Sequence, residues 1–249
     1  MDYYFWVLRN DLEVILVDTG FSEQGGARRG RITVVPPLQA LRELGIEPDD
    51  VRLVIVTHAH YDHIGNLCHF PNAQAVLSRR EYTFWTGPGD KPIFMSVAET
   101  GEIEELRRRH ELGTLRLVDD KHSLRPGVTL VDVGGHTPGQ LVVLVETGRL
   151  RVVLASDALH YYEEAERDRP FAIASNVPEM YDAYAWLREL ADDDRTVVVA
   201  GHDPDVMRRF PRQSGPVAGH AVRIAGERRL PPPPTATALR RPADTRTPL

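Results

Sequence analysis

The feature that most limits what this chain can fold into is a short apolar run that ends in a cluster of histidines. Residues 51–57 have the length and composition of a strand buried on both faces of a sheet. Directly after them come His58-Ala59-His60-Tyr61-Asp62-His63, which hold three imidazoles and a carboxylate. A length of 249 residues with 42% hydrophobic content suits one α/β domain. We therefore expect a single domain that presents this loop at the end of a central strand.

The side chains of this loop are the ligands that borderline divalent metals such as zinc prefer, namely imidazole nitrogens and carboxylate oxygens. His58 and His60 are alternate residues that can face one ion, while the adjacent Asp62 and His63 can face another. The spacing therefore predicts two metal sites close together, each of which needs further ligands. An accidental histidine-rich loop or a surface metal-binding tract is the alternative interpretation.

Three later segments each place a further candidate ligand next to a predicted strand. They are Gly134-Gly135-His136-Thr137-Pro138-Gly139, Ala155-Ser156-Asp157-Ala158 and Ala200-Gly201-His202-Asp203. With the first cluster they supply five histidines and two aspartates, which is enough for two ions if one carboxylate bridges them. The predicted metal ligands are therefore His58, His60, Asp62, His63, His136, Asp157 and His202.

Hydrophobic periodicity predicts a chain of alternating strands and helices. Strands are expected at residues 3–8, 12–17, 51–57, 73–78, 115–118, 128–133, 141–146, 151–155 and 196–200, with a further strand-like segment at 218–225. Helices are expected at residues 36–44, 101–112 and 178–191, with a short one that ends near Phe210, and residues 21–35 are expected to form a turn-rich loop. Residues 1–226 form the predicted metal-binding domain, and the proline- and arginine-rich residues 227–249 are predicted to be a disordered tail.

Charge and cysteine content narrow the possible partners and the compartment. The net charge of −6, from 30 basic and 36 acidic residues, gives no reason to expect nucleic acid or an anionic membrane as a partner. A small-molecule substrate fits better, with the protein as a monomer or a homodimer. Cys68 is the only cysteine, so the chain forms no internal disulfide. With neither a secretory leader nor a membrane span in the sequence, we expect a cytoplasmic protein.

The ordered ligands resemble those of the metallo-β-lactamase superfamily, whose pattern is H-x-H-x-D-H followed by a distant His, a distant Asp and a last His. The resemblance runs from about Trp6 to Phe210 and includes Val17-Asp18-Thr19-Gly20. It implies an α+β fold, a four-layer αββα sandwich with two divalent metals, expected to be zinc, at one edge. By that resemblance His58, His60 and His136 bind one metal, Asp62, His63 and His202 bind the second, and Asp157 bridges them.

Within this superfamily the sequence looks most like the N-acyl homoserine lactone lactonases, the enzymes of quorum quenching. The shared features are an aromatic residue within four positions of Asp157-Ala158, Phe171 in a Pro-Phe segment and the closing Gly-His-Asp-Pro. The resemblance implies ring opening of a lactone by a metal-bridging hydroxide. The alkoxide product then needs a proton, and the two candidate sources are metal-bound water and Asp62. His160 stands where those lactonases place a substrate-contacting tyrosine, so either His160 or Tyr161 is the candidate donor to the substrate carbonyl, and we favour Tyr161.

Several alternatives share part of this pattern. A thioester or other ester hydrolase like hydroxyacylglutathione hydrolase would keep the same ligands, and so would a phosphodiesterase, although the acidic balance argues against nucleic acid. A di-iron oxygen or nitric oxide reductase is a further alternative. Such a protein would need a flavin domain, which 249 residues leave no length to hold. A shortened, non-catalytic product is a further alternative, because the family usually begins with another strand before the segment that matches residues 3–17. Asp18 is interpreted as a structural cap of the turn after its strand.

Overall fold

The computed structural model describes residues 1–226, which form two compact units. The first, here called the N-terminal unit, comprises residues 3–120 and 212–221. The second, here called the C-terminal unit, comprises residues 1–2, 121–211 and 222–226. The predicted disordered tail, residues 227–249, lies outside the described residues.

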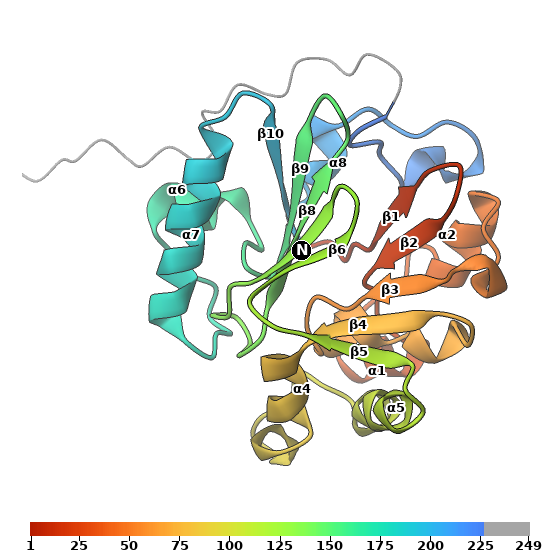
Figure 1. Ribbon diagram of the computed structural model, residues 1–249, viewed down its shortest axis with the longest axis vertical. Coiled ribbons are helices and arrows are strands. Elements are labelled where there is room, and N and C mark those ends of the chain that lie inside the picture. The colour runs from red at the N-terminus through yellow and green to blue at the C-terminus, as the bar shows by residue number, and fades with distance from the viewer. Residues whose placement is uncertain (227–249) are drawn as a thin grey trace, which may run out of the picture. The chain divides into compact units, whose positions relative to one another are not determined.

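The N-terminal unit is built on a mixed sheet in which the strands follow the order of the chain (Figure 1). Its strands are β1 (Trp6–Arg9), β2 (Val14–Val17), β3 (Leu53–Ile55), β4 (Gln74–Ser78) and β5 (Leu115–Val118). β1 and β2 form an antiparallel hairpin, and the remaining neighbours are parallel. All three residues of β3 are buried, as the apolar run predicted. The loop of histidines therefore leaves a central strand.

Helices connect the parallel strands of this unit. They are α1 (Glu23–Arg28), α2 (Pro37–Glu43), α3 (Tyr61–Ile64), α4 (Arg79–Trp85) and α5 (Thr100–Glu111). Ser78 caps α4 because its side chain accepts a hydrogen bond from the Arg80 amide. On α5, Ile103 and Leu106 pack into the apolar core. The same helix also buries the guanidinium of Arg109. That guanidinium donates to the carbonyl oxygens of residues 67, 70 and 73, and its Nε pairs with Glu105 Oε1 at 2.6 Å, which balances its charge inside the unit.

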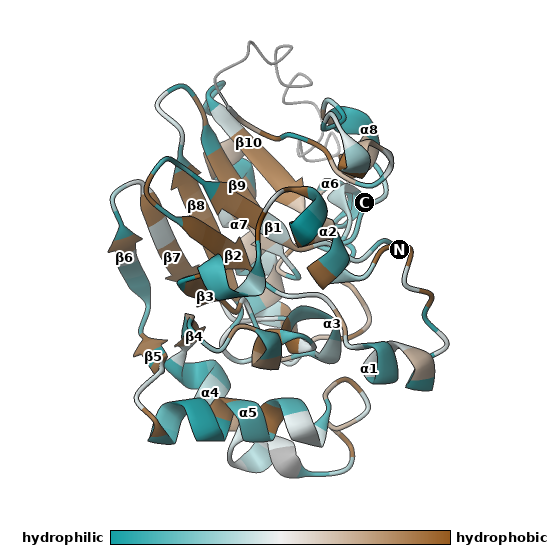
Figure 2. Cartoon of the chain, turned by 90° about the vertical axis from the view of Figure 1, so that its right-hand side faces the viewer, coloured by the Kyte–Doolittle hydropathy of each residue, from teal (hydrophilic) through white to brown (hydrophobic). Residues whose placement is uncertain are grey.

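The C-terminal unit holds the second sheet, whose order is β10-β9-β8-β7-β6. Its strands are β6 (Lys121–Arg125), β7 (Val128–Asp132), β8 (Leu141–Glu146), β9 (Arg151–Ser156) and β10 (Thr196–Ala200), and its helices are α6 (Tyr162–Arg167), α7 (Val177–Ala191) and α8 (Val206–Arg209). β9 and β10 are parallel, because the chain between them crosses over through α6 and α7. Figure 2 shows that β8, β9 and β10 are hydrophobic along most of their length, as strands of a buried sheet should be.

Most predicted elements are present, and three differences have a physical cause. β6 was not predicted, because Lys-His-Ser-Leu-Arg has no apolar run and this strand lies at the sheet edge. The predicted loop at 21–35 contains α1, since Gly26 serves close packing rather than a turn: a Cβ there would lie 2.6 Å from the Phe21 ring. The strand-like segment at 218–225 is wrong, because a 3-10 helix occupies Pro216–Gly219 and only an isolated bridge follows it. Within residues 1–226, no helix has the length and apolar character of a membrane span.

Candidate metal centre

The loop after β3 brings four predicted ligands together within the N-terminal unit. The rings of His58 and His60 lie 4.6 Å apart between centroids, and those of His58 and His63 lie 4.0 Å apart. Ligand atoms of His58 and His60 lie within 4.8 Å of each other, and so do those of Asp62 and His63. All four side chains are buried. The structure therefore brings these four side chains together, and their assignment to two metal ions stays a prediction.

Asp18 fixes the orientation of His63. Its Oδ2 lies 2.8 Å from His63 Nδ1, and its two oxygens also accept hydrogen bonds from the amide and the hydroxyl of Thr57, each at 2.8 Å. Because an ionised carboxylate only accepts, His63 donates through Nδ1 and keeps the lone pair on Nε2. The interpretation of Asp18 as a cap of the turn after its strand does not account for these contacts, which reach residues 39 and 45 positions away. A metal-binding histidine is commonly oriented by such a carboxylate.

The C-terminal unit holds the other three predicted ligands, and two of them, His136 and His202, lie beside the third, Asp157. His136 Nε2 lies 3.3 Å from Asp157 Oδ2, and His202 Nε2 lies 3.0 Å from Asp157 Oδ1. The Nδ1 atoms of these two histidines contact backbone carbonyl oxygens, those of Ile173 at 2.9 Å and of Asp2 at 2.7 Å. Each oxygen of Asp157 therefore faces a different histidine, which is the arrangement of a carboxylate shared by two sites.

Two glycines allow the backbone to make these turns. A Cβ at Gly201 would lie 2.6 Å from the carbonyl oxygen of Ser156, so no larger residue fits between β9 and β10 next to His202. Gly135 has φ +86°, and a Cβ there would lie 2.9 Å from the Met180 amide nitrogen at the start of α7. Both glycines therefore allow neighbouring stretches of backbone to approach each other closely next to the candidate ligands.

His160 lies beside the three predicted ligands of this unit. It is 1% exposed, its Nε2 lies 3.0 Å from Asp157 Oδ2, and its ring stacks on Phe171 with centroids 4.1 Å apart. Its Nδ1 lies 3.5 Å from Glu164 Oε1. Burial lowers the pKa of His160, but the carboxylates of Asp157 and Glu164 more than offset this and raise that pKa to about 9.

Tyr161 is half-buried at the start of α6, where its amide donates to Glu164 Oε1 at 3.1 Å. Burial raises the pKa of its hydroxyl, so the phenol stays neutral and able to donate a hydrogen bond. His160 therefore contacts Asp157 directly, whereas the role of Tyr161 as the donor to a substrate stays a prediction.

The donor set suits a pair of divalent metals. It consists of imidazole nitrogens and carboxylate oxygens, which zinc and similar ions prefer. In His58, His63, His136 and His202 the Nδ1 atom already has a polar neighbour in the protein, so Nε2 is the nitrogen that can bind an ion.

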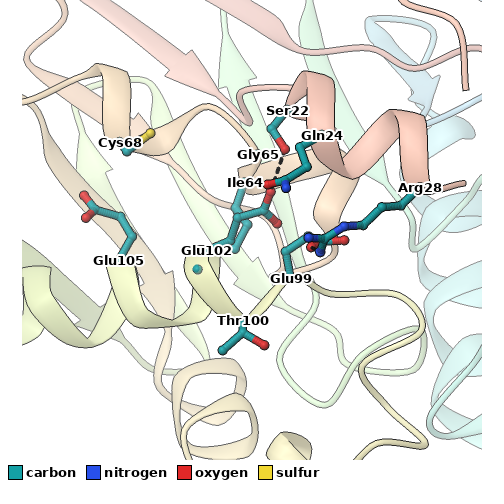
Figure 3. Close-up of a pocket in the computed structure, with 11 residues that line it drawn as sticks. Ser22, Gln24, Arg28, Ile64, Gly65, Cys68, Glu99, Thr100, Glu102 and Glu105 are labelled. Carbon is teal, nitrogen blue, oxygen red and sulfur yellow. Dashed lines mark hydrogen bonds and ion pairs between the residues drawn. The ribbon is translucent and has the colours of Figure 1, made fainter.

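A separate surface pocket of about 370 Å³ lies in the N-terminal unit between α1 and α5 (Figure 3). Its lining includes Glu99, Glu102 and Glu105, and none of the described residues that line it is a predicted ligand. Arg28 pairs with Glu99, while Ser22 donates to Glu102 at 3.2 Å. This pocket is therefore distinct from the set of predicted metal ligands.

Comparison with known proteins decides the family. Residues 3–202 match the sequence model of the family described as "Metallo-beta-lactamase superfamily". The chain belongs to this superfamily. The match confirms the predicted metallo-β-lactamase fold class and identifies the chain as a metal-dependent hydrolase.

Among curated proteins, the chain is similar to an N-acyl homoserine lactonase of Bacillus sp, with 27% identity over 215 residues, which cover 80% of each chain. It is 34% identical over 184 residues to the N-acyl homoserine lactonase AttM of Azorhizobium caulinodans, which covers 70% of this chain and 66% of the relative.

Among solved structures, an N-acyl homoserine lactone hydrolase with the product N-hexanoyl-L-homoserine at its catalytic metal center has a TM-score of 0.68, 23% identity and 83% coverage of each chain. AidC, a dizinc quorum-quenching lactonase, has a TM-score of 0.63 and 21% identity and covers 80% of this chain and 71% of that one. These two likenesses show the fold.

Proposed function

We propose that this chain opens the ring of a small lactone, such as an N-acyl homoserine lactone, with water and two divalent metal ions. The observation that carries the proposal is the carboxylate of Asp157, whose two oxygens face His136 and His202 at 3.3 and 3.0 Å. The lactone as substrate rests on the curated relatives, which are N-acyl homoserine lactonases at 27% and 34% identity.

In this proposal the seven predicted ligands are shared between two metal ions. His58, His60 and His136 hold one ion, Asp62, His63 and His202 hold the second, and Asp157 bridges. Support comes from each unit separately: the N-terminal unit pairs His58 with His60 and Asp62 with His63, and the C-terminal unit sets His136 and His202 on opposite oxygens of Asp157. Zinc is the proposed metal because every ligand is a histidine or an aspartate.

Two bound divalent metals lower the pKa of water toward neutrality and polarise a carbonyl group. The protein then has three tasks of its own. Asp62 receives a proton and returns it to the alkoxide that leaves when the ring opens. Tyr161 donates a hydrogen bond to the oxygen that gains charge, and His160 holds the Oδ2 side of Asp157 in place, 3.0 Å away.

The compartment and the assembly are proposed on sequence evidence. We propose a cytoplasmic enzyme, since a single cysteine offers no disulfide framework, and a monomer or homodimer acting on a small molecule.

A substrate panel tests the proposed reaction. Purified protein loaded with zinc should hydrolyse N-hexanoyl homoserine lactone with a higher kcat/KM than a glutathione thioester or bis(p-nitrophenyl) phosphate. Asp157→Ala is the matched variant, and it should lose most of the activity and much of both ions. A higher kcat/KM on the thioester would assign the chain to the thioester hydrolases of the same superfamily. Activity that persists in Asp157→Ala would contradict the ligand assignment.

A further inference from the structure

Glu81 is a carboxylate buried within the N-terminal unit next to the loop that carries His58 and His60. Its side chain is fully buried, with 0% exposure. One oxygen, Oε1, accepts two hydrogen bonds, from the Ala59 amide at 2.9 Å and from the Trp85 indole at 2.7 Å. Glutamate is almost never fully buried, because removing it from water carries a large free-energy cost. A specific arrangement must offset that cost.

The bond to Ala59 holds the backbone between the two histidines. The amides of alternate residues 57, 59 and 61 each donate a hydrogen bond to a different part of the unit. The acceptors are the Asp18 carboxylate, the Glu81 carboxylate and the Val97 carbonyl oxygen. The hydrogen bond to Glu81 is the one made by Ala59, the residue between His58 and His60. It fixes the peptide plane that follows His58 and thereby the direction in which both side chains leave the backbone.

The hydrogen bond from Trp85 to Glu81 fixes the position of the indole ring that packs against His60. Trp85 follows Glu81 by one helical turn on α4, so the carboxylate and the indole lie on the same face of the helix. The indole is almost completely buried, and its ring meets the His60 ring edge to face, with centroids 5.8 Å apart and an interplanar angle of 79°. Glu81 therefore acts on His60 both through the backbone and through the adjacent aromatic ring.

We infer that Glu81 is a positioning residue that holds His58 and His60 in the geometry needed to bind a metal ion. The inference rests on the proposed function, in which these two histidines are ligands. Outer hydrogen-bond partners of ligands commonly change metal affinity by about 10- to 100-fold. A purely structural role would instead lower the stability of the N-terminal unit without weakening the metal site.

Three substitutions separate these roles. Glu81→Met removes both acceptor contacts at similar volume. Glu81→Asp keeps the charge but shortens the side chain by one methylene, which draws the carboxylate away from both donors. It replaces Glu81→Met in the test if that variant does not fold. Glu81→Gln keeps an oxygen for both donors and should recover most of the loss. Arg109→Lys is the matched control, because Arg109 is also buried in this unit, at 1% exposure, and bonds carbonyl oxygens of residues 67, 70 and 73.

Zinc affinity is measured by chelator competition on the reloaded proteins, together with the Tm of each metal-free protein. We expect Glu81→Met and Glu81→Asp to lower the affinity for one of the two ions by about 10- to 100-fold, while Arg109→Lys lowers Tm and keeps wild-type affinity. Wild-type affinity in Glu81→Met or Glu81→Asp, or an equal loss in Arg109→Lys, would overturn the inference. A wild-type protein that binds no zinc would overturn the ligand assignment itself, and this inference with it.

Discussion

The contact between Asp18 and His63 gives the sharpest single test of how the protein prepares a metal ligand. Asp18→Asn keeps the size of the side chain but replaces one acceptor oxygen with an amino group. If the amino group faces His63, the ring must accept through Nδ1 and carry its proton on Nε2, which then has no lone pair for a metal. If the amino group faces the Thr57 amide, two donors meet where a bond of 2.8 Å existed. The first orientation reverses the bond to His63, and the second loses the bond to the Thr57 amide.

The expected loss follows from the role of such outer partners, about 10- to 100-fold in metal affinity. At about 1.4 kcal/mol for each tenfold, this is about 1.4 to 2.8 kcal/mol of binding free energy. The ion held by Asp62, His63 and His202 should leave first, so the metal content after gel filtration should fall from two ions per chain toward one.

The assay is chelator competition with metal content measured by mass spectrometry. Asn66→Ala is the control, because it removes side-chain bonds to the carbonyl oxygens of Thr19 and Phe21, both 2.9 Å long, without contacting His63. Asp18→Asn with two ions at wild-type affinity would refute the reasoning, and so would an equal loss of metal in Asn66→Ala.

Two further predictions concern substrate contact and pH. Tyr161→Phe should lower kcat on a lactone by about 10- to 1,000-fold, the range for one lost donor to an oxyanion, with metal content intact. His160→Ala should lower kcat less. Steady-state kinetics that give the reverse order would assign the donor role to His160. Burial raises the pKa of Glu102 from 4.5 to about 8, a rise that the Ser22 hydrogen bond partly opposes. The folded protein therefore holds a proton that the unfolded chain releases near pH 4.5, so the stabilising contribution is complete below that pH and is lost as the pH rises to about 8. Glu102→Gln should flatten the fall of Tm between these pH values, and an unchanged slope in a thermal melt series would contradict this.

The proximity of the first four candidate ligands was predictable because their positions depend on local sequence. His58 and His60 alternate along an extended segment, and Asp62 and His63 are neighbours, so the loop itself brings each pair together. Gly201 marked a close approach of the backbone next to His202 for the same local reason. Short-range geometry was enough for these features.

The supporting residues were not predictable in the same way. Glu81 stands in Arg79-Arg80-Glu81-Tyr82, which looks like the solvent-facing turn of an ordinary helix, and its burial arises only when α4 packs beside the loop at 58–60. The contact of Asp18 with His63 spans 45 positions of the chain, so nothing near Asp18 in the sequence indicates it. Tertiary packing decides both.

The central claim is that two metal ions share the carboxylate of Asp157. A crystal structure of the zinc-loaded protein, with diffraction data collected above and below the zinc absorption edge, tests it most directly. We expect two anomalous peaks per chain, one beside each oxygen of Asp157, with His136 on the first ion and His202 on the second. A single peak, or two peaks of which only one contacts Asp157, would contradict the claim.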